Sequence, residues 1–216
     1  IPWIFAFMTF SGSLNSNFSS MKQAVLNPLP LILVLFILHI VMPLWALGVG
    51  HVAFSGDAFT ITGLVLAMAI PTGITSFVWV SIYKGNIALT LSIILIDTML
   101  SPFIVPFTMS LLVGGNIEMD IVGITQGLFL MIVIPSIVGM TLNQVLKERV
   151  ARGLSARLSP FAKIGMGIVV MLNGAVVAPY LLDINLKLIG IAIIMFLVAF
   201  SGYLISFFTG KLFKQD

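Results

Sequence analysis

Two ionisable side chains, Asp97 and His39, lie deep inside long apolar stretches of this 216-residue sequence. Asp97 is nine residues beyond Ala88, where an apolar run begins, so a rise of about 1.5 Å per residue places it about 13 Å into a helix. A charged group at the centre of a bilayer costs about 2.5–3.5 kcal/mol on insertion scales, and such groups usually mark ion or substrate pathways. Asp97 is therefore a candidate cation-binding residue.

Asp97 shares one predicted helix face with other side chains. Thr90, Ile94, Asp97 and Ser101 are separated by four, three and four residues, the spacing that keeps side chains on one stripe. Three of the four carry oxygen, which suits a hard cation or a proton. The alternative is a protonated carboxyl group that hydrogen-bonds a neighbouring helix. His39 is either a proton relay or a buried histidine satisfied by a backbone carbonyl.

A cluster of Pro71, Gly73 and three hydroxyl side chains interrupts the apolar run 58–83. Proline cannot donate a backbone hydrogen bond, and glycine permits unusual dihedral angles. A helix broken at mid-membrane directs free N–H groups into the bilayer centre, where they bind anions, and such breaks point to a transporter's binding site. We expect non-helical backbone at 71–75 rather than an ordinary proline kink. The candidate substrate-binding residues are Thr72, Gly73, Thr75, Ser76 and Asn173, the last of which either lines a pocket or bonds a neighbouring helix.

The composition excludes several classes of protein. Hydrophobic residues make up 60% of the chain and charged residues only 8%, against about 25% charged in soluble domains. Soluble globular, disordered and nucleic-acid-binding proteins are therefore excluded, the last because 10 Lys and Arg residues form no basic patch. The absence of cysteine excludes disulfides and thiol chemistry. Enzymatic activity is not expected, because no carboxylates or histidines cluster at membrane depth.

The apolar runs are unbroken rather than alternating, which favours membrane-spanning helices over a β-barrel. They predict an all-α membrane protein, a bundle of about seven spans, in a single transmembrane domain over residues 1–216. The chain begins with Ile1 and shows no signal peptide, so we expect part of a longer protein. The predicted spans are 1–17, 28–50, 58–83, 88–114, 121–145, 160–182 and 186–210, with one long polar connection at 146–159.

The cations predict the orientation. The loops after spans one, three and five, with the C-terminus, hold nine of the ten Lys and Arg residues, and the other loops hold only Lys187. By the positive-inside rule, the cation-rich side is cytoplasmic. We therefore expect a multi-pass protein of the cell inner (plasma) membrane.

Three motifs resemble those of the bile acid:sodium symporter family. Residues 63–76 run from GLVL to PTGITS, residues 84–89 read KGNIAL, and residues 98–102 read TMLSP. Members of the family typically read PGGTASN, then K/R-G-N/D-x-A-L-S, then STLxSP. The resemblance implies a ten-helix fold of two inverted repeats, with a panel domain and a core domain that contains two crossed, broken helices. This chain would then hold helices two to eight, including the first broken helix at 71–75.

The family's sodium ligands are only partly matched. Ser76 corresponds to a family ligand, and Thr90 replaces a serine ligand. Phe77, Ile94 and Leu38 stand where the family has asparagine, threonine and glutamine. Three oxygen ligands are therefore replaced by apolar groups.

The resemblance and the deep polar residues together predict a secondary active transporter of an organic anion, bile-acid-like or a small carboxylate, driven by sodium or protons through alternating access. Asp97 would compensate for the lost ligands and bind the cation with Ser76 and Thr90. No cofactor is expected other than a sodium ion. The alternatives are a sodium-independent efflux carrier or a passive channel of a related fold. A retinal protein is disfavoured, because the last span has lysines only at its ends.

Overall fold

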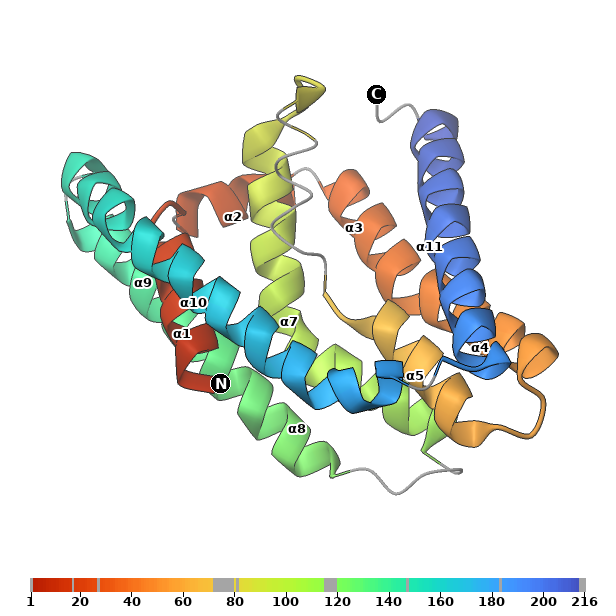
Figure 1. The fold of residues 1–216 in the computed structure, drawn as a ribbon. Coiled ribbons are helices and arrows are strands. Elements are labelled where there is room, and N and C mark those ends of the chain that lie inside the picture. The colour runs from red at the N-terminus through yellow and green to blue at the C-terminus, as the bar shows by residue number, and fades with distance from the viewer. Residues whose placement is uncertain are drawn as a thin grey trace. The chain divides into compact units, whose positions relative to one another are not determined.

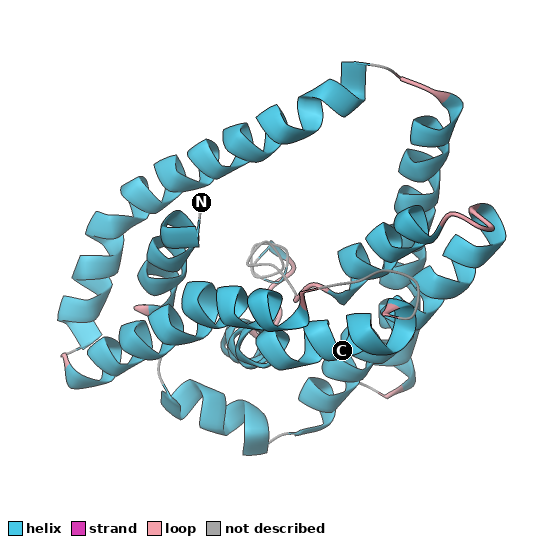
Figure 2. Cartoon of the chain, turned by 90° about the horizontal axis from the view of Figure 1, so that it is seen from below, coloured by secondary structure: helices cyan, strands magenta, loops and turns pink. Residues whose placement is uncertain are grey.

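The computed structural model describes residues 2–16, 18–26, 28–71, 80, 82–114, 120–146, 148–182 and 184–213. Every regular element in these ranges is a helix (Figure 2), which confirms the prediction of an all-α membrane protein. Five helical segments are long and apolar enough to cross a bilayer: Pro28–Ala53, Leu89–Val113, Ile121–Val145, Gly153–Leu182 and Leu186–Leu212. Helix α5, Ala58–Ala69, is apolar but shorter. The number of spans stays a prediction.

The long apolar runs become helices with nearly the predicted bounds. The run 28–50 corresponds to α3 (Pro28–Phe36), η1 (Ile37–Val41) and α4 (Met42–Ala53). The run 121–145 corresponds to α8 (Ile121–Leu128), η2 (Phe129–Val133) and α9 (Ile134–Val145). The runs 88–114 and 186–210 correspond to α7 (Ile87–Val113) and α11 (Leu186–Leu212).

Two regions differ from the sequence-based expectation. In place of a first span at 1–17, α1 covers Pro2–Ser13, and α2 follows at Phe18–Leu26. The polar connection at 146–159, expected to be a loop, is mostly helical, because α10 begins at Glu148 and continues to Leu182. The residues that open α10 include good helix formers such as Ala151 and Leu154, so the helix starts before its apolar part does.

The chain forms two compact units, each assembled from separate parts of the sequence. The first unit comprises Ile1–Leu26, Gly73–Pro102 and Val122–Asp183, and the second comprises Asn27–Thr72, Phe103–Ile121 and Ile184–Asp216. Helix α7 contributes its first part to one unit and its second part to the other.

In the first unit, α1 packs against both α9 and α10 (Figure 1). The helices approach closely at Gly139, where an added Cβ atom would lie 2.8 Å from the Cβ of Ser13 and 2.9 Å from the carbonyl oxygen of Phe10. Close approach at a small residue is typical of helix packing in membranes.

A buried polar cluster completes the packing of this unit. The Asn143 side-chain amide donates a hydrogen bond to the carbonyl oxygen of Leu14 at 2.6 Å. The Asn15 amide donates to the hydroxyl of Ser155 at 2.8 Å, and that hydroxyl donates to the carbonyl oxygen of Ser11 at 3.2 Å. Because α1 ends here, these side chains satisfy backbone carbonyls that have no partner within the helix.

The second unit has two hydrophobic clusters. The first lies between α5 and α7 and includes Ile61, Val65, Val105 and Met109. The second joins η1 and α4 to α11 (Figure 1) and is formed by Ile37, Met42, Ala46 and Val198.

Polar and close contacts between α4 and α11 reinforce the second cluster. The indole N–H of Trp45 donates to the hydroxyl of Ser201 at 2.8 Å. A Cβ atom added at Gly202 would lie 2.6 Å from the Cε of Met42, so a larger residue there requires the methionine to move.

Two of the long helices contain a π-helical turn directly before a proline. The backbone N–H of Met42 donates to the carbonyl oxygen of Ile37, and that of Ile134 donates to the carbonyl oxygen of Phe129, each a five-residue step. Pro43 and Pro135 follow at once, and a proline ring clashes with the carbonyl four residues earlier. The wider π-helical turn leaves space for the carbonyl group that faces each proline ring, so both prolines are accommodated without ending the helix.

Candidate ion- and substrate-binding site

Helix α5 ends at Ala69, immediately before the predicted break. Ile70 is extended, with φ −64° and ψ 148°, and Pro71 is not helical. The proline ring disfavours helical dihedral angles at the preceding residue, which explains why the helix ends here. The candidates Thr72, Gly73, Thr75 and Ser76 lie outside the described residues, so their predicted geometry stays a prediction.

The Lys84-Gly85-Asn86 motif forms the turn that starts α7. Lys84 adopts a positive φ of 57°, and the N–H of Gly85 donates to the carbonyl oxygen of Val80 at 2.8 Å. The side-chain oxygen of Asn86 then accepts the N–H of Leu89 at 3.0 Å, which caps the helix. This turn therefore sets the start of the helix that carries Thr90 and Asp97.

Asp97 is completely buried, in the part of α7 that belongs to the first unit. Ser101, one turn further along, is also completely buried, and Ser92 is 1% exposed. Thr90 and Ile94, the other two members of the predicted stripe, are partly buried. The hydropathy pattern gave no signal for Ser92, because a single serine in an apolar run is common in membrane helices.

Two hydroxyl groups of the predicted stripe donate to backbone carbonyls of α7 or of its capping residue. Thr90 donates to the carbonyl oxygen of Asn86 at 2.9 Å, and Ser101 donates to that of Thr98 at 2.7 Å. A hydroxyl that has used its proton in this way still has lone pairs, which accept hydrogen bonds or coordinate a cation. Ser101, one turn from Asp97, can therefore supply a neutral oxygen beside the carboxyl group, whereas Thr90 lies two turns away, about 10 Å along the helix axis.

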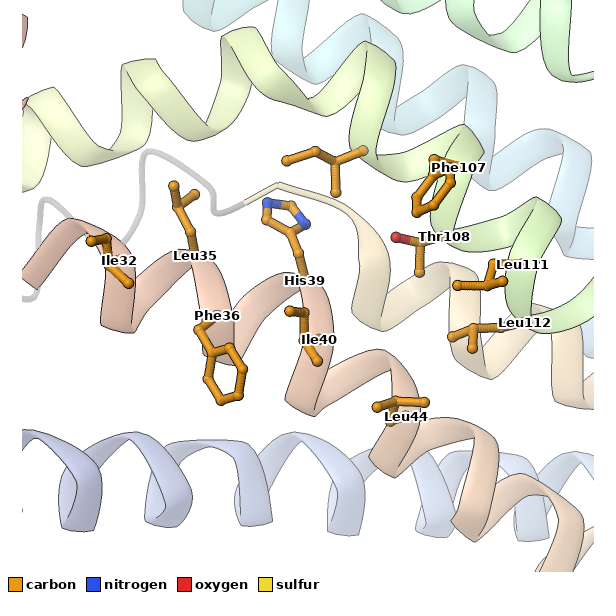
Figure 3. A pocket seen from close by; sticks show the side chains of 11 residues that line it. Ile32, Leu35, Phe36, His39, Ile40, Leu44, Phe107, Thr108, Leu111 and Leu112 are labelled. Carbon is orange, nitrogen blue, oxygen red and sulfur yellow. The ribbon is translucent and has the colours of Figure 1, made fainter.

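His39 lies in the second unit, within the π-helical turn η1, and is only 7% exposed. It lines a cavity between the α3–η1–α4 helix and α7 (Figure 3). The sequence singled out His39 but not Thr108, which is the other polar side chain among the described residues that line this cavity.

Asn173 lies on α10, and its side chain is exposed in this chain. Its amide N–H donates to the carbonyl oxygen of Val169 on the same helix at 3.0 Å. The described residues therefore give Asn173 a bond within its own helix.

Lys187, the exception in the cation count, has a specific partner. Its ammonium nitrogen lies 2.7 Å from the carboxylate of Asp57, which also caps α5 by accepting the N–H and hydroxyl of Thr60. The hydrogen bond from Lys187, followed by those from Thr60, lowers the pKa of Asp57 from 3.8 to about 2. Lys187 thus connects the starts of α11 and α5.

Comparisons with known proteins give the family. The model of the sodium bile acid symporter family matches residues 2–184. The chain is 51% identical to the "Uncharacterized protein YbaS" of Bacillus subtilis (strain 168), over all of this chain and 70% of that protein. It is 25% identical to the "Uncharacterized sodium-dependent transporter YocS" of the same organism, over 99% of this chain and 67% of that protein.

A plant protein is similar over a shorter region. The chain is 24% identical to the "Probable sodium/metabolite cotransporter BASS2, chloroplastic" of Oryza sativa subsp. japonica, over 69% of this chain and 35% of that protein. These matches confirm the resemblance carried by the motifs at 63–76, 84–89 and 98–102. The chain belongs to the sodium bile acid symporter family.

Proposed function

We propose that this chain is part of a secondary active transporter that carries a small organic anion across the membrane with sodium or protons. The observation that carries the proposal is the complete burial of Asp97 in a membrane helix of a symporter-family chain. A carboxylate at this depth is costly unless it is paired with a cation or hydrogen-bonded. Ionisable residues inside membrane spans usually mark ion or substrate pathways, which supports a role for Asp97 in binding the driving cation.

The proposed cation site consists of Asp97, Thr90 and Ser76. Asp97 supplies the charge, and the hydroxyl oxygen of Thr90 is two turns away on the same helix, with its proton already used on Asn86. Sodium prefers oxygen ligands, as other hard cations do. Asp97 thereby replaces the oxygen ligands lost at Phe77, Ile94 and Leu38.

The proposed substrate site lies after α5, at Thr72, Gly73, Thr75 and Ser76. The end of α5 at Ala69 and the extended Ile70 support a change of backbone direction at this point. An anion would be held by backbone N–H groups and hydroxyls. Asn173 is a further candidate contact, because its side chain is exposed and carries amide groups that can hydrogen-bond a substrate.

His39 is proposed as a relay if protons drive transport. Its burial and its place in a π-helical turn support this role, since π-bulges inside helices are frequent at functional sites. Loops after spans one, three and five would be cytoplasmic. The alternative, a sodium-independent carrier or passive channel, is favoured by the three apolar replacements among the family's sodium ligands.

The test compares Asp97→Asn with Asp57→Asn, the same chemical change at a carboxylate outside the spans. The thermal unfolding midpoint of the purified protein is measured in sodium chloride and in choline chloride. Sodium at 100 times its Kd stabilises a folded protein by about 2.7 kcal/mol, or about 5–11 °C for a chain of this size. We expect this rise in the wild type and in Asp57→Asn, and its loss in Asp97→Asn.

The same comparison distinguishes protons from sodium. One outcome is that the wild type shows no rise in midpoint with sodium, while proteoliposomes that contain it take up an organic anion only with a pH gradient. If Asp97→Asn then removes the dependence of uptake on the pH gradient, protons drive transport. If Asp97→Asn keeps the sodium and pH dependence of the wild type, Asp97 is structural and the proposed cation site is wrong.

A further inference from the structure

A cavity of about 670 Å³ lies within the second unit, between the α3–η1–α4 helix and α7 (Figure 3). One wall is formed by Ile32, Leu35, Phe36, His39, Ile40 and Leu44. The other is formed by Ile104, Phe107, Thr108, Leu111 and Leu112. The volume lies within the range of about 300–1,000 Å³ that is typical of small-molecule sites.

The cavity has an apolar rim and a polar floor. The rim residues Phe107 and Leu111 are 67% and 70% exposed, whereas His39 and Thr108 are each 7% exposed. Figure 3 shows the Thr108 hydroxyl turned toward the imidazole ring of His39. Both walls belong to helices long and apolar enough to span a bilayer, so we expect the cavity between them to lie at the depth of the lipid acyl chains.

The shape of the cavity favours an elongated occupant. Its residues on the first wall recur every three or four positions from Ile32 to Leu44, which marks one stripe along the helix. The twelve steps from Ile32 to Leu44, at about 1.5 Å each, give a stripe about 18 Å long. His39 and Thr108 interrupt the apolar surface partway along this length.

The chemistry of the walls restricts the charge of the occupant. Among the described residues, no side chain that lines the cavity carries a carboxylate, ammonium or guanidinium group. An ionised ligand group would therefore be buried without an opposite charge, which is costly. A neutral ligand group that donates or accepts hydrogen bonds is matched by an imidazole and a hydroxyl.

We infer that this cavity binds an uncharged, single-chain lipid with one hydrogen-bonding group, a hydroxyl or carbonyl. The apolar chain lies along the stripe between the two helices, and the polar group meets His39 and Thr108 at the floor. The site differs from the proposed anion site after α5, and it does not depend on the proposed transport function.

The test uses three photoactivatable probes with the same aliphatic chain: an alcohol, a fatty acid and an alkane. Each is crosslinked at subsaturating concentration to the purified protein in nanodiscs, and the labelled residues are identified by mass spectrometry. We expect the alcohol to label the lining segments 32–44 and 104–112 about five-fold more than the alkane, the effect of one hydrogen bond of about 1 kcal/mol. The ionised fatty acid should label them less than the alcohol.

Two variants and a matched control locate the binding. Thr108→Val keeps the size of the side chain and should remove the advantage of the alcohol without reducing alkane labelling. Leu111→Trp fills the cavity and should reduce labelling by both probes. Phe207→Trp, at an exposed apolar residue of α11 outside the lining, should leave all labelling unchanged. Circular dichroism and gel filtration check that each variant is folded.

Three results would overturn the inference. The first is equal labelling by alcohol and alkane, which would mean that the polar floor is not used. The second is labelling that Leu111→Trp does not reduce. The third is a disulfide-linked dimer of Phe107→Cys formed in place of probe labelling, which would mean that a second copy of the chain covers the cavity.

Discussion

Replacing Gly139 by alanine tests the closest helix contact in the first unit. The added Cβ atom would lie 2.8 Å from the Cβ of Ser13, 2.9 Å from the carbonyl oxygen of Phe10 and 3.2 Å from the carbonyl carbon of Ser13. Two of these three neighbours are backbone atoms, which cannot rotate away as the end of a side chain does. Helix α1 must therefore shift away from α9 to accept the methyl group.

The expected loss of stability is the difference between two opposing effects. Overpacking costs about 1–3 kcal/mol, and a contact with backbone belongs at the upper end of this range. Alanine in place of glycine inside a helix contributes about 1 kcal/mol in the favourable direction. The net destabilisation is then about 1–2 kcal/mol, which lowers the unfolding midpoint of a chain of this size by about 2–8 °C.

The assay is thermal unfolding of the detergent-solubilised protein, followed by the helical circular dichroism signal. Gly153→Ala is the control, because it lies inside α10 and an added Cβ atom would meet nothing within 4 Å. Its midpoint should rise by up to about 4 °C. If Gly139→Ala is as stable as Gly153→Ala, α1 and α9 do not approach as closely as described, and the reasoning is refuted.

Three further predictions concern the loops and the proposed break. The ion pair with Lys187 lowers the pKa of Asp57 from 3.8 to about 2. The ion pair therefore stabilises the fold above pH 3.8, and this stabilisation is lost as the pH falls toward 2. Between pH 3.8 and 2, the unfolding midpoint of Lys187→Met should therefore fall less than that of the wild type. The chain has no cysteine, so single cysteines can be labelled selectively. A membrane-impermeant maleimide added outside intact cells should label Glu118→Cys but not Arg152→Cys, and the reverse result would invert the predicted orientation. Gly73→Leu should abolish uptake of the organic anion while membrane insertion, measured by fractionation, is unchanged. Undiminished uptake would mean that this position does not support the proposed substrate site.

The apolar runs predicted the long helices well because burial in lipid imposes a simple rule on their composition. The run 121–145 has the predicted bounds, and 186–210 is extended only to Leu212. The start of α10 could not be found in the same way. Hydropathy detects where a helix enters the lipid, whereas the charged turns from Glu148 onward are helical without being apolar.

Only some residues of the candidate site could be predicted from the sequence. Asp97 and His39 were visible because an ionisable residue is rare in an apolar run, and both are buried. Thr108 and the π-helical turn around His39 were not predictable, because they depend on which helix packs opposite and on a change of hydrogen-bond register before Pro43. The polar cluster around Asn143 was missed for the same reason, since its partner, the carbonyl of Leu14, is 129 residues away in sequence.

That sequence separation has a consequence for synthesis of the protein. Asn143 and Ser155 bond to the end of α1 across 129 and 144 residues, respectively. At about 5–20 residues per second, the ribosome takes roughly 6–29 s to make the partners after α1 has emerged. During this interval the carbonyls of Leu14 and Ser11 must be hydrated or bound by the insertion machinery. The contacts that α1 makes in the first unit therefore form only after α9 and the start of α10 have been synthesised.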